Sequence, residues 1–218
     1  NAGKAGMGIE EIVKAFSSRW RAYHPDIVIY YEACNSIPHV VFRQADQGIA
    51  DFHRSWYGQL ASGLYYRSML YTYGVEKLHF HLARHQRLLP VLQAFRASLR
   101  QFVRLVRAEG ATPIFVLQTT QVPEAPVLRT LSLETEQEIR ATTQQLAEAD
   151  TRALYDRIAK VRTYWIQVFV EAVRREGEAA GIQVIDPRPA FSAHSGNPPI
   201  FCDEVHLADQ GNELIARQ

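Results

Sequence analysis

The sequence has few cysteines, no long apolar run and no excess of charge of one sign. Its 218 residues include two cysteines, which excludes a four-cysteine zinc module and a small disulfide-stapled fold. No apolar stretch reaches about 18 residues, so no transmembrane helix is expected. Lysine and arginine (24) nearly balance aspartate and glutamate (23), giving a net charge of +1. That balance provides no electrostatic reason to expect a nucleic-acid partner.

The chain opens with Asn1-Ala-Gly-Lys-Ala-Gly6. This start contains neither an initiator methionine nor a signal-peptide pattern. We therefore expect it to be the larger, C-terminal part of a longer protein. A signal segment further upstream would make the protein secreted or periplasmic, so localisation stays open. With 47% hydrophobic residues, the chain can bury a sizeable core, and we assign residues 1–218 to one domain.

Three short runs rich in β-branched and aromatic residues predict strands, at residues 26–32, 112–118 and 182–186. The first run is nearly continuous in apolar residues, which is typical of a strand buried on both faces.

Apolar residues at helical spacing predict helices over residues 9–20, 88–109 and 155–180. His24-Pro25 ends the first helix, and Gly110 and Gly181 close the other two. Helix, glycine, strand and polar loop occur twice in this order, which indicates right-handed βαβ crossovers and a parallel sheet. The sequence therefore predicts the α/β class.

Two stretches exceed a minimal α/β unit, residues 38–85 and 122–150. Both follow predicted strands, at the sheet edge where α/β proteins bind ligands. They either shape a site or are ordinary helical excursions that pack on the core. The aromatic residues between Trp56 and Tyr73 fit three roles: a cap over an acyl group, a membrane-contacting surface or core packing.

Three polar segments have residue types suited to catalysis. Asp203 lies three residues before His206, and a carboxylate in that position can orient an imidazole as a general base. Asn35 follows the first predicted strand, where its amide could donate a hydrogen bond to an oxyanion. Gly6 lies in a glycine-rich segment before a helix. Each segment alone is equally consistent with a structural His, a turn-forming Asn or a simple loop.

Together, and in this order, these segments resemble the SGNH hydrolases, the GDSL-like esterase and lipase family. NAGKAG is similar to the family's glycine block, PDIVIYYEACNS to the Asn block and CDEVHLADQGNELIA to the final block. The resemblance implies a three-layer α/β/α fold with a parallel, flavodoxin-like sheet. It also implies catalytic roles for four residues: Gly6 and Asn35 as oxyanion donors, Asp203 as the orienting acid and His206 as the base.

The chain departs from the family pattern in two places. Cys34 and Ser36 replace the Gly and Asp that flank the family's Asn. The block that holds the nucleophilic serine is absent, since no serine here follows a strand in a glycine-flanked turn. The resemblance thus implies an ester hydrolase whose nucleophile, and the N-terminal strands that carry it, lie upstream of this chain.

The resemblance implies an acyl or acetyl ester substrate, as a small molecule or a carbohydrate, and no cofactor or metal. The alternatives are a catalytically inactive, esterase-like binding domain and a carbohydrate O-acyltransferase. Two further hypotheses concern pairs of residues. His81 and His85 share a helix face and could bind a metal or form a solvated basic face. Cys34 and Cys202 each precede a proposed catalytic residue, so they form either a disulfide beside the site or two free thiols.

Overall fold

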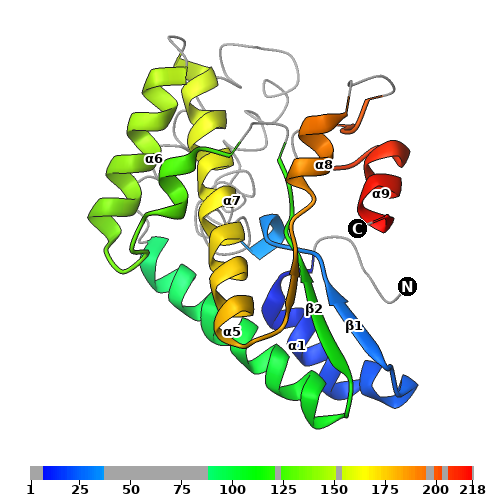
Figure 1. The fold of residues 1–218 in the computed structure, drawn as a ribbon. Helices are drawn as coiled ribbons and strands as arrows, with labels where there is room; N and C mark the ends of the chain where they lie inside the picture. Colours follow the sequence, from blue (N-terminus) through cyan, green and yellow to red (C-terminus); the bar gives the residue numbers. More distant parts are fainter. Residues whose placement is uncertain are drawn as a thin grey trace, which may run out of the picture.

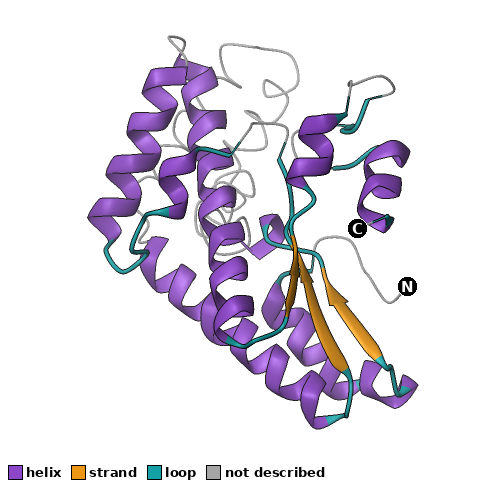
Figure 2. Cartoon of the chain, in the orientation of Figure 1, coloured by secondary structure: helices purple, strands orange, loops and turns teal. Residues whose placement is uncertain are grey.

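A three-stranded parallel sheet forms the centre of the computed structural model, which describes residues 7–36, 88–120, 124–150, 154–194, 199–202 and 206–217. The strands β1 (Ile27–Tyr30), β2 (Thr112–Val116) and β3 (Gln183–Ile185) lie in the order β1-β2-β3 (Figures 1 and 2). All three predicted strands are confirmed, each shorter than predicted by one or two residues at an end. The α/β class is therefore confirmed.

Two long helices connect the strands. The helix α5 (Leu88–Ala108) leads into β2, and α7 (Leu154–Ala179) leads into β3. Both predicted glycine caps are confirmed, because Gly110 and Gly181 have φ angles of 78° and 61° in the left-handed region that glycine tolerates best. The remaining helices in the described residues are α1 (Ile9–Ser18), α6 (Glu136–Asp150), α8 (Arg188–Ala193) and α9 (Asp209–Ala216).

The first helix ends earlier than its apolar spacing predicts. The helix α1 stops at Ser18, and residues Trp20–Tyr23 form a separate 3-10 turn. His24 then takes a left-handed conformation with φ 46° and ψ 56°, out of the α region as its position before Pro25 requires. The chain thus reverses into β1 over a few residues.

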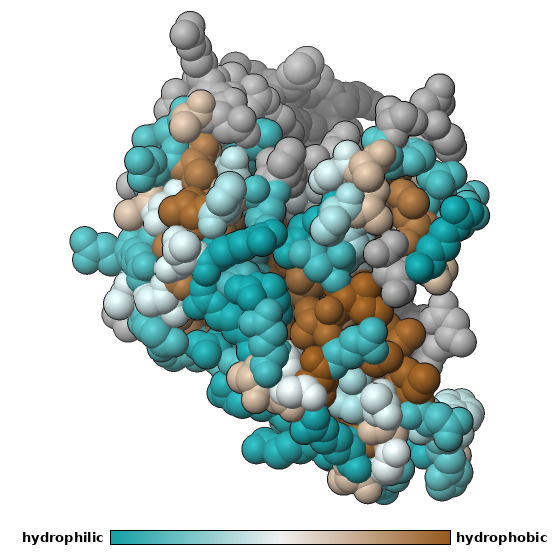
Figure 3. Space-filling view, viewed as in Figure 1, coloured by the Kyte–Doolittle hydropathy of each residue, from teal (hydrophilic) through white to brown (hydrophobic). Residues whose placement is uncertain are grey.

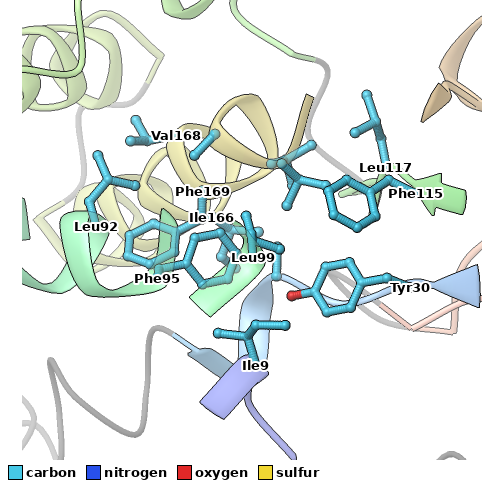
Figure 4. Close-up of a cluster of buried hydrophobic side chains, with 14 of the residues drawn as sticks. Ile9, Tyr30, Leu92, Phe95, Leu99, Phe115, Leu117, Ile166, Val168 and Phe169 are labelled. Carbon is cyan, nitrogen blue, oxygen red and sulfur yellow. The ribbon is translucent and has the colours of Figure 1, made fainter. Parts of the chain in front are cut away.

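One face of the sheet carries the main core. Tyr30, Phe115 and Val184 occupy adjacent positions across the three strands. The Tyr30 ring lies 5.7 Å from that of Phe102 on α5. It lies 5.4 Å from that of Phe115, which is beside it in Figure 4. On α7, a Cβ atom at Gly177 would lie 2.5 Å from Val184 Cγ2, so this helix approaches the same face closely. The helices α5 and α7 therefore cover one face together.

The opposite face of β1 is exposed. Ile27 and Ile29 point away from that core and are 56% and 62% exposed. Figure 3 shows hydrophobic side chains gathered over this side of the sheet. The prediction that residues 26–32 form a strand buried on both faces is therefore wrong. The reason is position: β1 is an edge strand among the described strands, whereas continuous apolar runs are typical of central strands.

The second predicted insertion forms a helix that packs on α7. Residues 136–150 form α6, which packs along α7. Trp165 on α7 donates a hydrogen bond to Thr143 Oγ1 on α6. The first insertion, residues 38–85, lies outside the described residues, and with it the aromatic stretch and the His81–His85 pair. Within the part of the chain that the structure describes, no helix has both the length and the apolar character needed to cross a membrane.

Candidate functional site

The loop after β1 is organised around a buried carboxylate, Glu32, which is 7% exposed. Its Oε1 atom accepts hydrogen bonds from the backbone N–H groups of Asn35 (2.5 Å) and Ser36 (3.1 Å). Its Oε2 atom accepts from the hydroxyls of Tyr30 (3.0 Å) and Ser36 (2.9 Å). Burial raises the pKa of the Glu32 carboxyl, and the hydrogen bonds from Ser36, Tyr30 and Asn35 oppose that shift.

Gln118, just beyond the end of β2, fixes the first half of the same loop. Its Oε1 atom accepts from the backbone N–H groups of Ala33 and Cys34, both at 2.8 Å. Side chains thus satisfy four consecutive backbone donors, from Ala33 to Ser36, where the strand ladder no longer can. Each of these four backbone donors therefore has a side-chain hydrogen-bond partner.

The side chain of Asn35 takes little part in this network. Its Oδ1 atom lies 3.7 Å from the Cys34 thiol that donates to it, and its Nδ2 amine donates to no residue in the described ranges. Asn35 lines a groove of about 980 Å³ that runs along the outer edge of β1. Asn35 is thus half-buried beside this groove and lies just beyond the carboxyl end of β1.

Ser36 has a structural role. Its hydroxyl donates to Glu32, and its Oγ atom accepts the backbone N–H of Ile9 at 3.1 Å. Ile9 is the first residue of α1, and its N–H has no partner inside the helix. Ser36 thus caps α1 from a position 27 residues away, and the hydroxyl is committed to this contact instead of being exposed for nucleophilic attack.

His206 lies in a short segment that pairs with residues 200–202. The backbone N–H of Cys202 donates to the carbonyl of His206 (2.8 Å), and that of Ala208 donates to the carbonyl of Ile200 (2.8 Å). Phe201 and Leu207 form the antiparallel bridge between these bonds. Residues 200–202 and 206–208 are thereby held together just before α9, and His206 is exposed.

Gly211 on α9 packs closely against Ile200 and Leu207, which lie near His206 in the chain. A Cβ atom there would lie 2.5 Å from the Ile200 carbonyl oxygen and 2.9 Å from Leu207 Cδ2. Distances this short are not observed for real Cβ atoms, so only glycine allows α9 to pack against the backbone of the His206 loop. The glycine of the final block thus has a packing reason that its sequence position alone does not reveal.

A second cavity, of about 430 Å³, has residues linked to each of the two segments in its wall. Gln118, which holds the Asn35 loop, lines it, as do Ile200 and Phe201, which pair with the residues around His206. We refer to it as the inter-loop pocket. His206 itself lines neither cavity. The full set of described lining residues is Gln118, Thr119, Thr120, Glu124, Arg129, Gln167, Val170, Arg188, Pro189, Phe191, Ser192, Ile200 and Phe201.

Charged groups in the inter-loop pocket neutralise one another. Arg188 pairs with Glu124 and, at 2.5 Å, with Asp186, while Arg129 pairs with Glu124 at 2.7 Å. Burial alone would raise the pKa of the Asp186 carboxyl. Hydrogen bonds from Arg188 outweigh this effect of burial and hold the pKa below its ordinary value. The two guanidinium groups of the pocket lining, those of Arg129 and Arg188, thus pair with Glu124, which also lines the pocket, and with Asp186, which does not.

Two of the four predicted site residues lie within the described residues, Asn35 and His206. Gln118, which bonds to the Asn35 loop, and Phe201, which bridges to Leu207 next to His206, line the same pocket. Gly6 and Asp203 lie outside the described residues. Cys34 and Cys202 are both free thiols, so the disulfide alternative is not formed here. No group of three or more His, Cys, Asp or Glu side chains among the described residues could hold a metal.

Sequence reasoning missed the two side chains that organise the Asn35 loop. The segment PDIVIYYEACNS contains Glu32, and the predicted strand at residues 112–118 ends in Gln118, but neither pattern assigns a role to these side chains. A polar residue directly after an apolar strand was the available signal for both. Comparison with known proteins adds no further guide, because no family model, curated protein or solved structure matches this chain.

Proposed function

We propose that this chain is part of a serine-type ester hydrolase of the SGNH kind, acting on an acyl or acetyl ester. In this proposal the whole protein has a three-layer α/β/α fold, and the nucleophilic serine comes from a segment outside these 218 residues. The observation that carries the proposal is the arrangement at the end of β2. The inter-loop pocket has in its wall Gln118, which accepts hydrogen bonds from the loop that carries Asn35, and Phe201, which bridges to Leu207 beside the exposed His206.

The chemistry follows from general acid–base and oxyanion-hole principles. His206 takes the serine proton as the hydroxyl attacks the ester carbonyl, and it later returns the proton to the leaving alcohol. Asp203 orients the ring and stabilises its cationic form. The Asn35 amide and the Gly6 N–H stabilise the oxyanion, and the acyl-enzyme is then hydrolysed by water.

The polarity of the inter-loop pocket bears on which part of the ester it takes. Paired charges line part of it. An alkyl chain would desolvate these groups without replacing their interactions, whereas an uncharged, hydroxylated alcohol can hydrogen-bond to them. This favours a sugar-like alcohol, and transfer of the acyl group to a sugar hydroxyl is the second candidate function.

The decisive experiment is labelling of the full-length protein with a fluorophosphonate probe, followed by mass-spectrometric location of the labelled residue. We expect one serine from outside residues 1–218 to be labelled, and His206→Ala to lose the label. Absence of labelling in the folded wild-type protein would favour the alternative of a catalytically inactive binding domain. Labelling of Ser36 would contradict its structural role.

A further inference from the structure

The two segments assigned to the oxyanion hole are linked by buried hydrogen bonds. The Ile9 N–H, at the start of α1, donates to Ser36 Oγ, and the Ser36 hydroxyl donates to Glu32 Oε2. Glu32 Oε1 in turn accepts the N–H of Asn35. One continuous chain of hydrogen bonds therefore runs from the helix that follows the glycine block to the loop that carries Asn35.

We propose that Glu32 and Ser36 are positioning residues that hold the start of α1 and the Asn35 loop at a fixed separation, so that the Asn35 amide keeps one orientation toward the reacting carbonyl oxygen. This inference rests on the proposed function for its catalytic meaning, but the relay itself is independent of it. Neither residue touches the substrate; both act through Asn35 and through the start of α1.

Burial makes this relay stronger than a surface contact would be. Ser36 and Glu32 are both 7% exposed, so water cannot replace a lost partner cheaply. The start of α1 is also tied to Glu11, whose carboxylate accepts the Gly8 N–H at 3.2 Å. A Cβ atom at Gly8 would lie 3.3 Å from Ser36 Oγ, so the two segments are in close contact as well as hydrogen-bonded.

The relay also accounts for one departure from the family pattern. Ser36 stands where the SGNH hydrolases have Asp after the Asn. An aspartate here would place a second carboxylate against Glu32, and two like charges at that distance in a buried site are unfavourable. The serine hydroxyl can instead donate to Glu32 and accept from Ile9 at once, which a carboxylate cannot do.

Amide hydrogen exchange tests the relay without any need for catalysis. In Glu32→Gln, we expect exchange at Ile9 to accelerate by about ten-fold, because losing one hydrogen bond of this kind has about that effect. Ile9 does not contact Glu32, so a change there requires transmission through Ser36. Conversely, Ser36→Ala should accelerate exchange at Asn35, whose N–H bonds only to Glu32. The matched control is Glu176→Gln, a buried glutamate on α7 that should change neither amide.

Kinetics of the full-length protein test the catalytic meaning. Ser36→Ala should lower kcat by about ten-fold with KM within about two-fold, since a misplaced oxyanion donor weakens mainly the transition state. Unchanged exchange at Ile9 in Glu32→Gln and at Asn35 in Ser36→Ala would overturn the relay. If the wild type neither hydrolyses esters nor reacts with fluorophosphonate, the proposed function fails, whereas accelerated exchange at these amides would still uphold the relay.

Discussion

At the scale of single residues, the candidate site depends on side chains that satisfy backbone groups at the ends of strands. Glu32 and Gln118 together accept four consecutive N–H groups of the Asn35 loop. The sequence shows which residues follow a strand, but not which backbone donors they will meet. Gln118 binds residues 84 and 85 positions earlier in the chain, and such a pairing depends on the sheet register.

Asn35→Ala tests the amide donor directly. The substitution should lower kcat by about 10²–10³-fold with little change in KM, which is the usual effect of losing one oxyanion-hole donor. The measurement is steady-state ester hydrolysis by the full-length protein. Gln137→Ala, which removes an exposed amide on α6, serves as the control. A kcat equal to that of the wild type would remove Asn35 from the oxyanion role.

Glu32→Gln should remove a pH dependence of stability. Burial raises the folded-state pKa of Glu32 above its ordinary value of 4.5. This carboxyl therefore stabilises the fold fully at pH values below 4.5, where it is protonated in both states, and that contribution is lost as the pH rises through the raised folded pKa. Glutamine cannot ionise, so the variant should gain stability relative to the wild type as the pH rises.

Urea unfolding of both proteins between about pH 4 and 8 measures this difference. Glu10→Gln, on the exposed side of α1, is the control and should follow the wild type. If the wild type and Glu32→Gln show parallel stability curves over the whole range, the Glu32 carboxyl is not destabilised by burial.

At the scale of elements, the sequence predicts the strands and the two long helices well. Their apolar spacing and closing glycines are local signals, and local signals need no knowledge of the tertiary fold. The exposure of Ile27 and Ile29 could not be predicted in the same way. Whether an apolar strand is central or at an edge depends on which strands pair with it, and no residue of β1 encodes that.

Gly211→Ala should displace the loop that ends in His206. The added methyl group would meet the Ile200 carbonyl at 2.5 Å, so either α9 or the loop must move, at a cost of about 1–3 kcal/mol for overpacking of this kind. We expect lower thermal stability and at least about ten-fold lower kcat, because small displacements of a catalytic group have large effects. Asn212→Ala, on the exposed side of α9, should leave both unchanged.

Gly177→Ala tests how closely α7 approaches the sheet. A methyl group there would lie 2.5 Å from Val184 Cγ2 and 3.0 Å from Phe115 Cδ2. Alanine normally stabilises a helix interior by about 1 kcal/mol over glycine, but here overpacking should dominate and lower the unfolding free energy by about 1–2 kcal/mol net. Chemical denaturation gives the value, and a stabilised variant would show that α7 can move away from the sheet freely.

At the scale of the whole molecule, the distribution of apolar surface is uneven. The helices α5 and α7 bury one face of the sheet, while Ile27 and Ile29 on the other face remain exposed on β1, an edge strand among the described strands. An apolar strand at a sheet edge promotes association between molecules.

Ile29→Lys should therefore reduce concentration-dependent association of this chain. Because Ile29 is 62% exposed, its replacement should change the unfolding free energy by no more than about 0.5 kcal/mol. Sedimentation velocity over a range of concentrations measures the association. The matched control is Val127→Lys, at another exposed position. Ile12→Lys would not serve as a control, because Ile12 packs against the core. Equal association in all three proteins would exclude β1 as the contact.

The exposed thiol of Cys202 has a practical consequence. Its backbone N–H bonds to the carbonyl of His206, so the thiol is attached to the same loop as the imidazole, whereas Cys34 is half-buried and contacts Gln118. A maleimide fluorophore would react first with the more accessible sulfur. If the proposed ester hydrolysis holds, the emission of this label should change when substrate is added, and no residue of the proposed machinery need be replaced to follow it.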